Sequence, residues 1–335
     1  GDGKATITGL KKATPYQISH KKYGSVNGKT ALVDAKDIAK QFEDRGARYT
    51  TGNTAPDRTE KAATSNVQVV VDDDGNYKVI VKKDIDHTVE IPDTWGEVKI
   101  DLNDKTITGD KADDNNEAKP GLEFVKDANS NEHPGTNLEI VNGTIKGGDG
   151  SAKHPDGAAG IGASGDTADA GIIIGSDANV TGGNGADGTE GKDGGNGGAG
   201  IPGNGGNGGT GISAGDKTIT INPGGTVKGG DAGNGGNATG DNTNPGGNGG
   251  NGGTGTETTQ PGKTDNNGGT TSGGNGGDGG KSDIGNGGNG GNGGNGSTGE
   301  NNNNGGTSSG GSGGNGGDSD KGNGGSGGNG GSSGE

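Results

Sequence analysis

The sequence predicts a mainly β protein with Gly-rich repeats, in three parts: a small α+β domain over residues 1–95, a β-solenoid over 96–228 and a C-terminal polyglycine II helix bundle over 229–335. Three observations predict this fold class. Glycine supplies 88 of the 335 residues, while only 21% are hydrophobic. A degenerate strand repeat recurs between residues 96 and 228, and glycine occupies every third position through 182–211. A chain with so few apolar residues must rely on backbone hydrogen bonds over much of its length, or stay unfolded.

The first part has the pattern of an ordinary α+β domain. The stretches "KATITGL" and "TPYQI" predict short strands, and "VQVVVDDDGNYKVIV" predicts a hairpin with Asp74-Gly75 at its turn. The stretch "TALVDAKDIAKQFEDRG" predicts a helix with Asp34 as N-cap and Gly46 as C-terminal stop. Its predicted buried face consists of Leu32, Ala35, Ile38, Ala39 and Phe42.

The second part contains four copies of one pattern: an alternating apolar strand, a corner of Asn, Asp or Gly, a short second strand, and then glycine. The copies are "EVKIDLNDKTITGD", "NLEIVNGTIKGGDG", "GIIIGSDANVTGGNG" and "KTITINPGGTVKGGD". Their anchor residues Ile107, Ile145, Val180 and Val227 recur at intervals of 38, 35 and 47 residues. Short strands at a long, loosely fixed period indicate coils of a solenoid, with Gly-rich excursions that leave from one corner.

One of these copies resembles a known family. The stretch "IDLNDKTITG", residues 100–109, is similar to the coils of the right-handed parallel β-helix of bacterial surface proteins, with Asp104 where those coils usually have Gly. The resemblance covers about a third of the chain. It implies the fold and little about activity.

The regular glycine phase of residues 182–211 helps to choose between three structures: a flexible linker, a collagen strand and a polyglycine II helix. A flexible linker needs no phase, and collagen needs far more proline than the single Pro202 of this stretch. A polyglycine II helix has three residues per turn and no internal hydrogen bonds, so its backbone groups must pair with neighbouring chains. We therefore predict that one glycine phase packs against neighbouring backbone, while the variable phase, which includes Asn184, Asp187, Asn196 and Ala199, faces solvent. The predicted packing glycines are Gly182, Gly185, Gly188, Gly191, Gly194, Gly197, Gly200, Gly203, Gly206 and Gly209.

The third part breaks into six short glycine triplet runs separated by polar linkers of uneven length. With the 182–211 stretch, these runs resemble the glycine-helix bundles of phage tail-tip adhesins and of a snow-flea antifreeze protein. The resemblance implies a two-layer bundle. A disordered low-complexity tail is the alternative interpretation.

Charge and composition narrow the partners and the compartment. A net charge of −16 disfavours nucleic acid and anionic membranes, and no stretch is apolar enough for a membrane span. The absence of cysteine and methionine, with a first residue Gly1, is consistent with a processed, exported chain. We expect an extracellular or cell-surface location and a bacterial source, with cell-surface or polysaccharide contact as a further expectation.

No motif predicts catalysis, a cofactor or a metal. Residues 182–187, 273–278 and 313–318 begin like calcium-binding G-G-x-G-x-D nonapeptides, but the apolar residue that this family needs is replaced by Thr189, Gly280 and Asp320. The loop "DANSN" (127–131) lacks the Gly and the bidentate Glu of a calcium loop, so a polar turn is the better interpretation. Every arginine precedes the solenoid, and the four histidines show no metal spacing. We expect no enzyme, no cofactor and no metal site.

The function that these patterns favour is mechanical: a structural subunit of an extracellular fibre, pilus-like filament or surface layer, polymerising with itself through backbone pairing. The predicted assembly element is a first strand that adds to a neighbour's sheet, formed by Lys4, Ala5, Thr6, Ile7, Thr8, Gly9 and Leu10 within residues 1–14. The second hypothesis is a receptor-binding adhesin with recognition loops at 239–245, 256–272 and 297–309. An ice-binding protein is the third.

Overall fold

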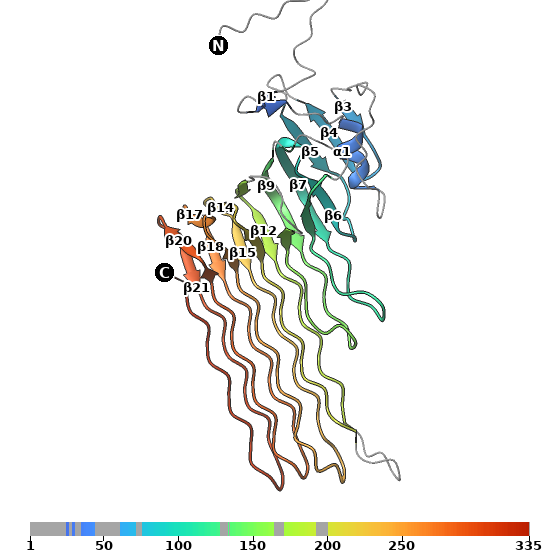
Figure 1. Ribbon diagram of the computed structural model, residues 1–335, viewed down its shortest axis with the longest axis vertical. Helices are drawn as coiled ribbons and strands as arrows, with labels where there is room; N and C mark the ends of the chain where they lie inside the picture. Colours follow the sequence, from blue (N-terminus) through green and yellow to red (C-terminus); the bar gives the residue numbers. More distant parts are fainter. Residues whose placement is uncertain are drawn as a thin grey trace, which may run out of the picture.

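The computed structural model describes residues 25–26, 29–30, 35–43, 61–71, 76–127, 133, 135–163, 171–191 and 200–334. In these residues the protein is mainly β, with a single short helix. Strands gather at one end of the elongated molecule, and extended Gly-rich segments run from them to loops at the opposite end (Figure 1). The prediction of a mainly β protein is therefore confirmed.

The N-terminal part combines one helix with an antiparallel sheet. Strands β3 (Lys61–Ala63), β4 (Val67–Val71) and β5 (Tyr77–Val81) pair in antiparallel order, as the predicted hairpin requires. Helix α1 (Ala35–Gln41) packs on β3 and β4, and four residues of its predicted face, Ala35, Ile38, Ala39 and Phe42, are fully buried as predicted. Strands β1 (Ser25–Val26) and β2 (Lys29–Thr30) pair in antiparallel orientation. Several predicted features lie outside the described residues: the strands at 4–10 and 14–18, the helix residues Leu32, Asp34 and Gly46, and the turn at Asp74-Gly75.

The rest of the chain repeats a three-strand unit whose first strands stack in parallel into a six-stranded sheet. The order of this sheet follows the sequence, from β6 at one edge to β19 at the other. Its strands are β6 (Val89–Pro92), β8 (Leu122–Val125), β10 (Ile161–Ala163), β13 (Ile212–Gly215), β16 (Thr256–Thr258) and β19 (Ser297–Thr298).

The second and third strands of each unit build two more parallel columns, which the two long strands β7 (Gly96–Thr108) and β9 (Thr136–Lys146) join into one 13-stranded sheet. Strand β5 pairs in parallel with β7 and so attaches the N-terminal part to this sheet. The second column continues with β11 (Gly171–Ile174), β14 (Thr218–Ile221), β17 (Lys263–Asn266) and β20 (Glu300–Asn303). The third continues with β12 (Ala178–Thr181), β15 (Thr226–Lys228), β18 (Thr270–Ser272) and β21 (Thr307–Ser309).

The corner between the second and third strands recurs in every unit and always contains a residue with positive φ. This left-handed conformation disfavours most side chains but tolerates Gly, Asn and Asp. It explains why each corner of the repeat carries one of those three residues, including Asp104 (φ 60°) at the position where a Gly was expected. The corner residues are Asn103, Asn142, Asp177, Gly224, Gly268 and Gly305, with φ of 50°, 59°, 53°, 83°, 100° and 87°.

The interior of the stack is apolar in the first four units. The predicted anchors pair in register, Ile107 with Ile145, Ile145 with Val180, and Val180 with Val227, and all four are buried. Trp95 and the strand residues that face the same interior join them in one hydrophobic core.

The strands do not stop at residue 228, where the sequence indicated the end of the solenoid. Val227 pairs with Thr271 and Thr271 with Ser308, so two further units continue the sheets. Their inward positions carry small polar residues in place of Ile and Val. This substitution is the reason that the apolar pattern ended at 228 while the fold did not.

Several hydroxyl groups bond to one another in this polar part of the interior, although the buried Thr258 Oγ1 has no hydrogen-bond partner in the described part of the chain. Thr256 Oγ1 donates to Ser297 Oγ at 2.9 Å, and Thr264 Oγ1 donates to Thr256 Oγ1 at 3.2 Å. All three residues are at most 5% exposed. Burying a polar group costs free energy unless the group is hydrogen-bonded. In these units, the chain of hydrogen-bonded hydroxyls therefore takes the place of the hydrophobic contacts of the earlier units.

Thr256→Val should destabilise the protein more than Thr264→Val. The first change leaves the Thr264 hydroxyl without its acceptor, at a cost of about 1–3 kcal/mol, whereas the second removes the donor itself and should cost less than about 1 kcal/mol. Urea unfolding of the two variants and of the wild type measures the difference. Equal losses of unfolding free energy would contradict the hydroxyl chain.

Candidate functional site: the glycine slab and a groove on the sheet

Between one unit and the next, the chain leaves the sheets in an outgoing Gly-rich segment and comes back in a return segment. The outgoing segments are residues 182–191, 229–237, 273–281 and 310–318, and the return segments are 200–211, 246–255, 286–296 and 323–332. They lie side by side as long extended tracks beyond the strands (Figure 1). We call the eight segments together the glycine slab.

Three consecutive residues show how the slab is held together. Gly233 N–H donates to the carbonyl of Gly206 in the neighbouring return segment, at 2.9 Å, and Gly235 N–H donates to Asp278 of the next outgoing segment, at 2.8 Å. Asn234 N–H donates to the Asp187 side chain of the preceding outgoing segment, at 2.7 Å. Each residue therefore bonds to a different neighbour, and outgoing and return segments form two bonded layers.

Close packing explains the glycines of the slab. A methyl group on Gly185 would collide with the carbonyl oxygen of Gly206, and one on Gly188 with that of Gly203. Among the ten predicted packing glycines, a similar backbone obstruction meets Gly182, Gly185, Gly188, Gly191, Gly203, Gly206 and Gly209. Gly194 and Gly197 lie outside the described residues, and Gly200 is exposed, so the prediction does not hold for it.

The predicted division into one packed phase and one solvent-facing phase needs correction. A methyl group on Gly183, in the third phase, would also collide with a backbone oxygen, and so would one on Gly205 or Gly208, which continue the phase of Asn184 and Asp187 into the return segment. Asn184 and Asp187 themselves face solvent, as expected, while Asn196 and Ala199 lie outside the described residues. The exposed Asn and Asp side chains also form hydrogen bonds. Asn184 Oδ1 accepts the N–H of Asp231 in the next outgoing segment, at 3.1 Å.

These side chains form ladders that run from unit to unit. Along one ladder of the return layer, the N–H groups of Asn248, Asn289 and Ser326 donate to the Oδ1 atoms of Asn204, Asn248 and Asn289, each at 2.9 Å. A second ladder connects Asn207, Asn251, Asn292 and Asn329 in the same way, also at 2.9 Å. The Asn residues of these ladders are thus structural, and Asp187, Asp231 and Asp278 accept N–H groups in the same way in the outgoing layer. The regular recurrence of Asn or Asp after paired glycines could have indicated this role.

The two surfaces of the slab differ in charge. The outgoing segments carry Asp187, Glu190, Asp231, Asp278 and Asp318, with Lys281 as the single cation of these ranges. The return segments contain no charged residue. We define the return face as the outward polar side chains of the return segments, beside which Ile201 is 82% exposed. These polar residues are Asn204, Asn207, Thr210, Asn248, Asn251, Thr254, Asn286, Asn289, Asn292, Asn295, Asn323, Ser326, Asn329 and Ser332.

In the sixth unit, one edge of the slab has no neighbouring segment among the described residues. In the preceding unit, Gly290 and Gly293 donate N–H groups to the carbonyls of Ser326 and Asn329, both at 2.8 Å. Their equivalents Gly327 and Gly330 donate to no backbone acceptor among the described residues. A methyl group on Gly327 would have the carbonyl oxygen of Gly314 as its nearest atom, 3.6 Å away, whereas one on Gly290 would collide with that same oxygen. Along this edge, unoccupied space lies beside backbone N–H groups that have no acceptor among the described residues. We call it the open edge.

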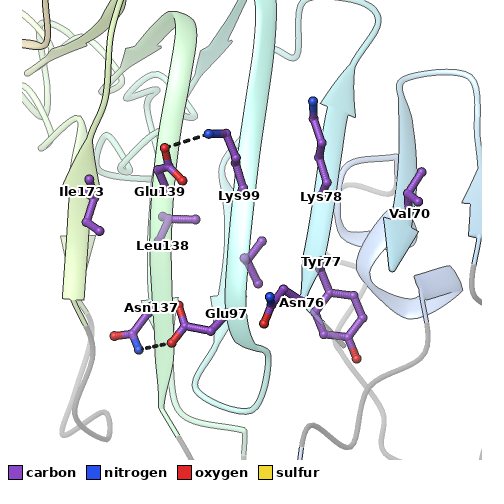
Figure 2. A pocket seen from close by; sticks show the side chains of 11 residues that line it. Val70, Asn76, Tyr77, Lys78, Glu97, Lys99, Asn137, Leu138, Glu139 and Ile173 are labelled. Carbon is purple, nitrogen blue, oxygen red and sulfur yellow. Dashed lines mark hydrogen bonds and ion pairs between the residues drawn. The ribbon is translucent and has the colours of Figure 1, made fainter. Parts of the chain in front are cut away.

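A separate groove lies on the outer face of the 13-stranded sheet, near the N-terminal part (Figure 2). It has a cavity volume of about 630 Å³ and lies across strands β4, β5, β7, β9 and β11, with Val70 and Ile173 at its two ends. Its polar groups are already paired: Lys99 Nζ lies 2.7 Å from Glu139 Oε1, and Asn137 Nδ2 donates to Glu97 Oε1 at 2.7 Å. The groove therefore offers aliphatic surface between satisfied charges.

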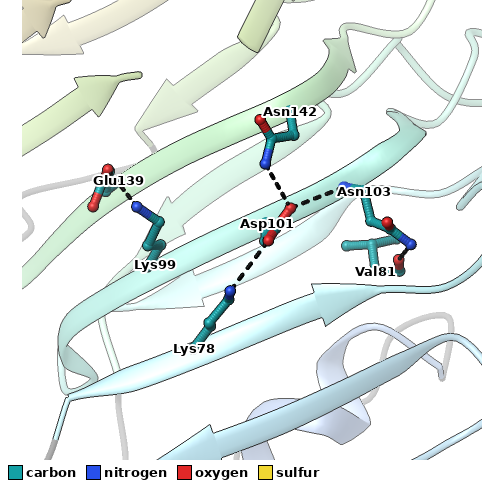
Figure 3. A network of polar contacts seen from close by, with 7 residues as sticks. All are labelled: Lys78, Val81, Lys99, Asp101, Asn103, Glu139 and Asn142. Carbon is teal, nitrogen blue, oxygen red and sulfur yellow. Dashed lines mark hydrogen bonds and ion pairs between the residues drawn. The ribbon is translucent and has the colours of Figure 1, made fainter. Parts of the chain in front are cut away.

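Asp101 organises the polar network beside this groove (Figure 3). Its carboxylate accepts Asn142 Nδ2 at 3.0 Å and the N–H of Asn103 at 3.2 Å, and it lies 3.2 Å from Lys78 Nζ. Burial by itself raises the pKa of the Asp101 carboxyl, but the hydrogen bonds from Asn142, Lys78 and Asn103 outweigh it and hold the pKa below its ordinary value of 3.8. These bonds also tie two successive corners, at Asn103 and Asn142, to one side chain.

The remaining sequence candidates do not converge on a site. Among the described residues, no three His, Asp or Glu side chains come together at metal-binding distances, and no helix has the length and apolar character of a membrane span. In the "DANSN" loop, the described Asp127 donates its N–H to the buried Asp93, which also lies 3.0 Å from His133 Nδ1. The predicted assembly strand, Lys4 to Leu10, lies outside the described residues.

Comparisons with known proteins add no relative: no family model, no curated protein and no solved structure matches this chain. The resemblance of the strand repeat to parallel β-helices therefore rests on the quoted residues alone.

Replacing Gly185 and Gly188 together by Ala should lower the melting temperature strongly. Both methyl groups meet backbone oxygens that cannot move without displacing a neighbouring segment, and such overpacking costs about 1–3 kcal/mol per site. Asn184→Ala should cost only about 0.5–1.5 kcal/mol, because it removes one exposed hydrogen bond. Thermal unfolding followed by circular dichroism compares the variants, and equal tolerance of both changes would contradict the packed slab.

Asp101→Asn should lower stability at pH 6 by about 1–3 kcal/mol, the value of hydrogen bonds to a charged group. Because the pKa of Asp101 is depressed in the folded protein, its contribution is present above pH 3.8 and is lost as the pH falls through the depressed pKa. The difference between wild type and variant should therefore shrink between pH 4 and pH 2. Urea unfolding at several pH values tests this, and a constant difference would contradict it.

Proposed function

We propose that this protein is a structural subunit of an extracellular fibre or surface layer, and that subunits associate through backbone pairing at the open edge. The proposal includes a finer description of the fold. The stacked strand units are coils of a β-solenoid, and the glycine slab is a bundle of polyglycine II helices.

Two observations support this description of the fold. Parallel columns of strands with a recurring left-handed corner are what successive coils of a solenoid produce. In the slab, side chains that face solvent recur every third residue, and the N–H groups of three consecutive residues bond to three different neighbours. A helix with three residues per turn has this property.

The open edge is the observation that carries the functional proposal. Each unit of the slab binds the next through the same backbone bonds, and nothing in this geometry closes on itself, so the stack can grow by repetition. At the opposite end, β5, β4, β3 and α1 lie beyond β7. The open edge is therefore the surface where a second copy can add without displacing an existing strand.

Composition is consistent with such a role. The chain has no cysteine to oxidise, and the groups available for growth are backbone N–H and C=O groups, which do not ionise. A fibre needs a second, different surface on each subunit, because pairing between two identical edges closes a dimer. The strand predicted at Lys4 to Leu10 remains the candidate for that surface.

The adhesin hypothesis loses two of its three recognition loops. Residues 256–272 and 297–309 contain strands β16 to β18 and β19 to β21, which continue the sheets. Only the 239–245 loop keeps the place expected for it, between an outgoing and a return segment. We therefore retain the fibre as the proposal.

Replacing Gly324, Gly327 and Gly330 together by Ala should abolish association while leaving the subunit folded. In the single subunit each added methyl group has its nearest neighbour 3.6 Å away, so melting temperature should stay within a few degrees of the wild type. In an assembly the same methyl groups would occupy the place of the next segment. Electron microscopy and sedimentation velocity measure fibre formation by both proteins.

The matched control carries Thr210→Ala and Thr254→Ala, which lie on the return face away from the open edge, and it should assemble like the wild type. Fibres with a constant axial repeat from the wild type and the control, but not from the glycine variant, would support the proposal. Monomers or closed dimers of the wild type at high concentration, or undiminished fibres of the glycine variant, would refute it.

A further inference from the structure

The return face differs from the rest of this acidic molecule because it carries no charged residue: it has fourteen outward polar side chains, with the exposed Ile201 beside them, and no acid or base. The outgoing segments on the other side of the slab carry five carboxylates against one lysine. An approaching surface that is itself anionic is repelled by the molecule as a whole, and a cationic one is drawn to the other side. The return face thus favours a neutral partner.

The ladders fix which part of each Asn faces outward. The Oδ1 atoms of Asn204, Asn248 and Asn289 accept N–H groups of the next unit, each at 2.9 Å. No hydrogen bond joins the Nδ2 atoms of these residues to any described part of the chain, and all three side chains are exposed. The orientation of each amide is therefore set by the fold, and its two N–H donors point away from the slab.

The donors form a regular array. Along one return segment they recur every three residues, a spacing of about 9.3 Å for a threefold extended helix. From one unit to the next they recur at about 4.8 Å, the distance between hydrogen-bonded neighbours in a sheet. Donors that are already oriented lose little conformational freedom on binding, and a repeated ligand engages several of them at once.

We propose that the return face binds a neutral polysaccharide, whose hydroxyl, ring and glycosidic oxygens supply a repeating set of uncharged acceptors. A second copy of the same face is a poorer occupant, because its outward groups are also amide donors and its Oδ1 atoms are already committed to the ladders. The proposal concerns a different surface from the open edge and does not depend on fibre growth.

The test replaces donors without disturbing the ladders. Asp187 and Asp278 occupy ladder positions in the outgoing layer, where their Oδ1 atoms accept the N–H groups of Asn234 and Asn315, both at 2.7 Å. An Asp can thus keep the bond between units while it loses the outward donors and adds a negative charge. The return-face variant is Asn251→Asp with Asn289→Asp, two positions that belong to different ladders. The control, Asn237→Asp with Asn275→Asp, makes the same chemical change in the outgoing layer.

The full chain and both variants are incubated with insoluble cellulose, chitin and β-1,3-glucan, and bound protein is measured by depletion, with melting temperatures to confirm the fold. We expect the wild type and the control to bind at least one of the three, the return-face variant to bind it at least tenfold more weakly, and binding to change little between 50 mM and 500 mM NaCl. Absence of binding to all three would overturn the proposal, as would equal loss in both variants. Self-association of the wild type that the return-face variant alone abolishes would assign the face to a second copy and overturn it as well.

Discussion

The close approach of backbone to backbone is the constraint on which this structure depends. Every amide of a chain excluded from water needs a partner, and in the slab the N–H of Gly233 finds one 2.9 Å away only because neither segment carries a side chain between them. A methyl group at Gly233 would collide with Ala186. Glycine content, segment spacing and the two-layer arrangement all follow from this requirement, and hydrophobic burial plays little part in the slab.

The strand units supply what the slab lacks. The buried Ile and Val residues of the first four units form one core with the N-terminal helix and Trp95, and this core fixes the spacing at which glycine segments leave the sheets. In the last two units hydroxyl pairs such as Thr256 with Ser297 replace apolar contacts. Interior packing therefore changes chemistry along the stack while the strand spacing, and with it the pairing of the slab, stays constant.

The surfaces proposed for association and for binding both arise from this regularity. In a stack that repeats one set of bonds, the N–H groups at the end of the stack have no following unit to bind. The N–H of Gly327 therefore has no backbone acceptor among the described residues, whereas that of Gly290 has one. Repetition also places identical side chains at identical intervals, so the amides of Asn248 and Asn289 present the same donors in successive units. The groove beside Asp101, by contrast, has its charges paired internally.

The sequence by itself determined the mainly β class, the helix and hairpin of the N-terminal part, and the glycine phase. It also determined the register of the anchors Ile107, Ile145, Val180 and Val227. Each of these features leaves a local periodicity in the sequence. It did not reveal that strands continue after residue 228, since Thr and Ser at Thr271 and Ser308 fill inward positions without an apolar signal. Nor could it show that Asn184 bonds to the next unit or that one face is free of charge. Those features depend on which segments become neighbours across some 40 residues of chain, a pairing that only the tertiary structure decides.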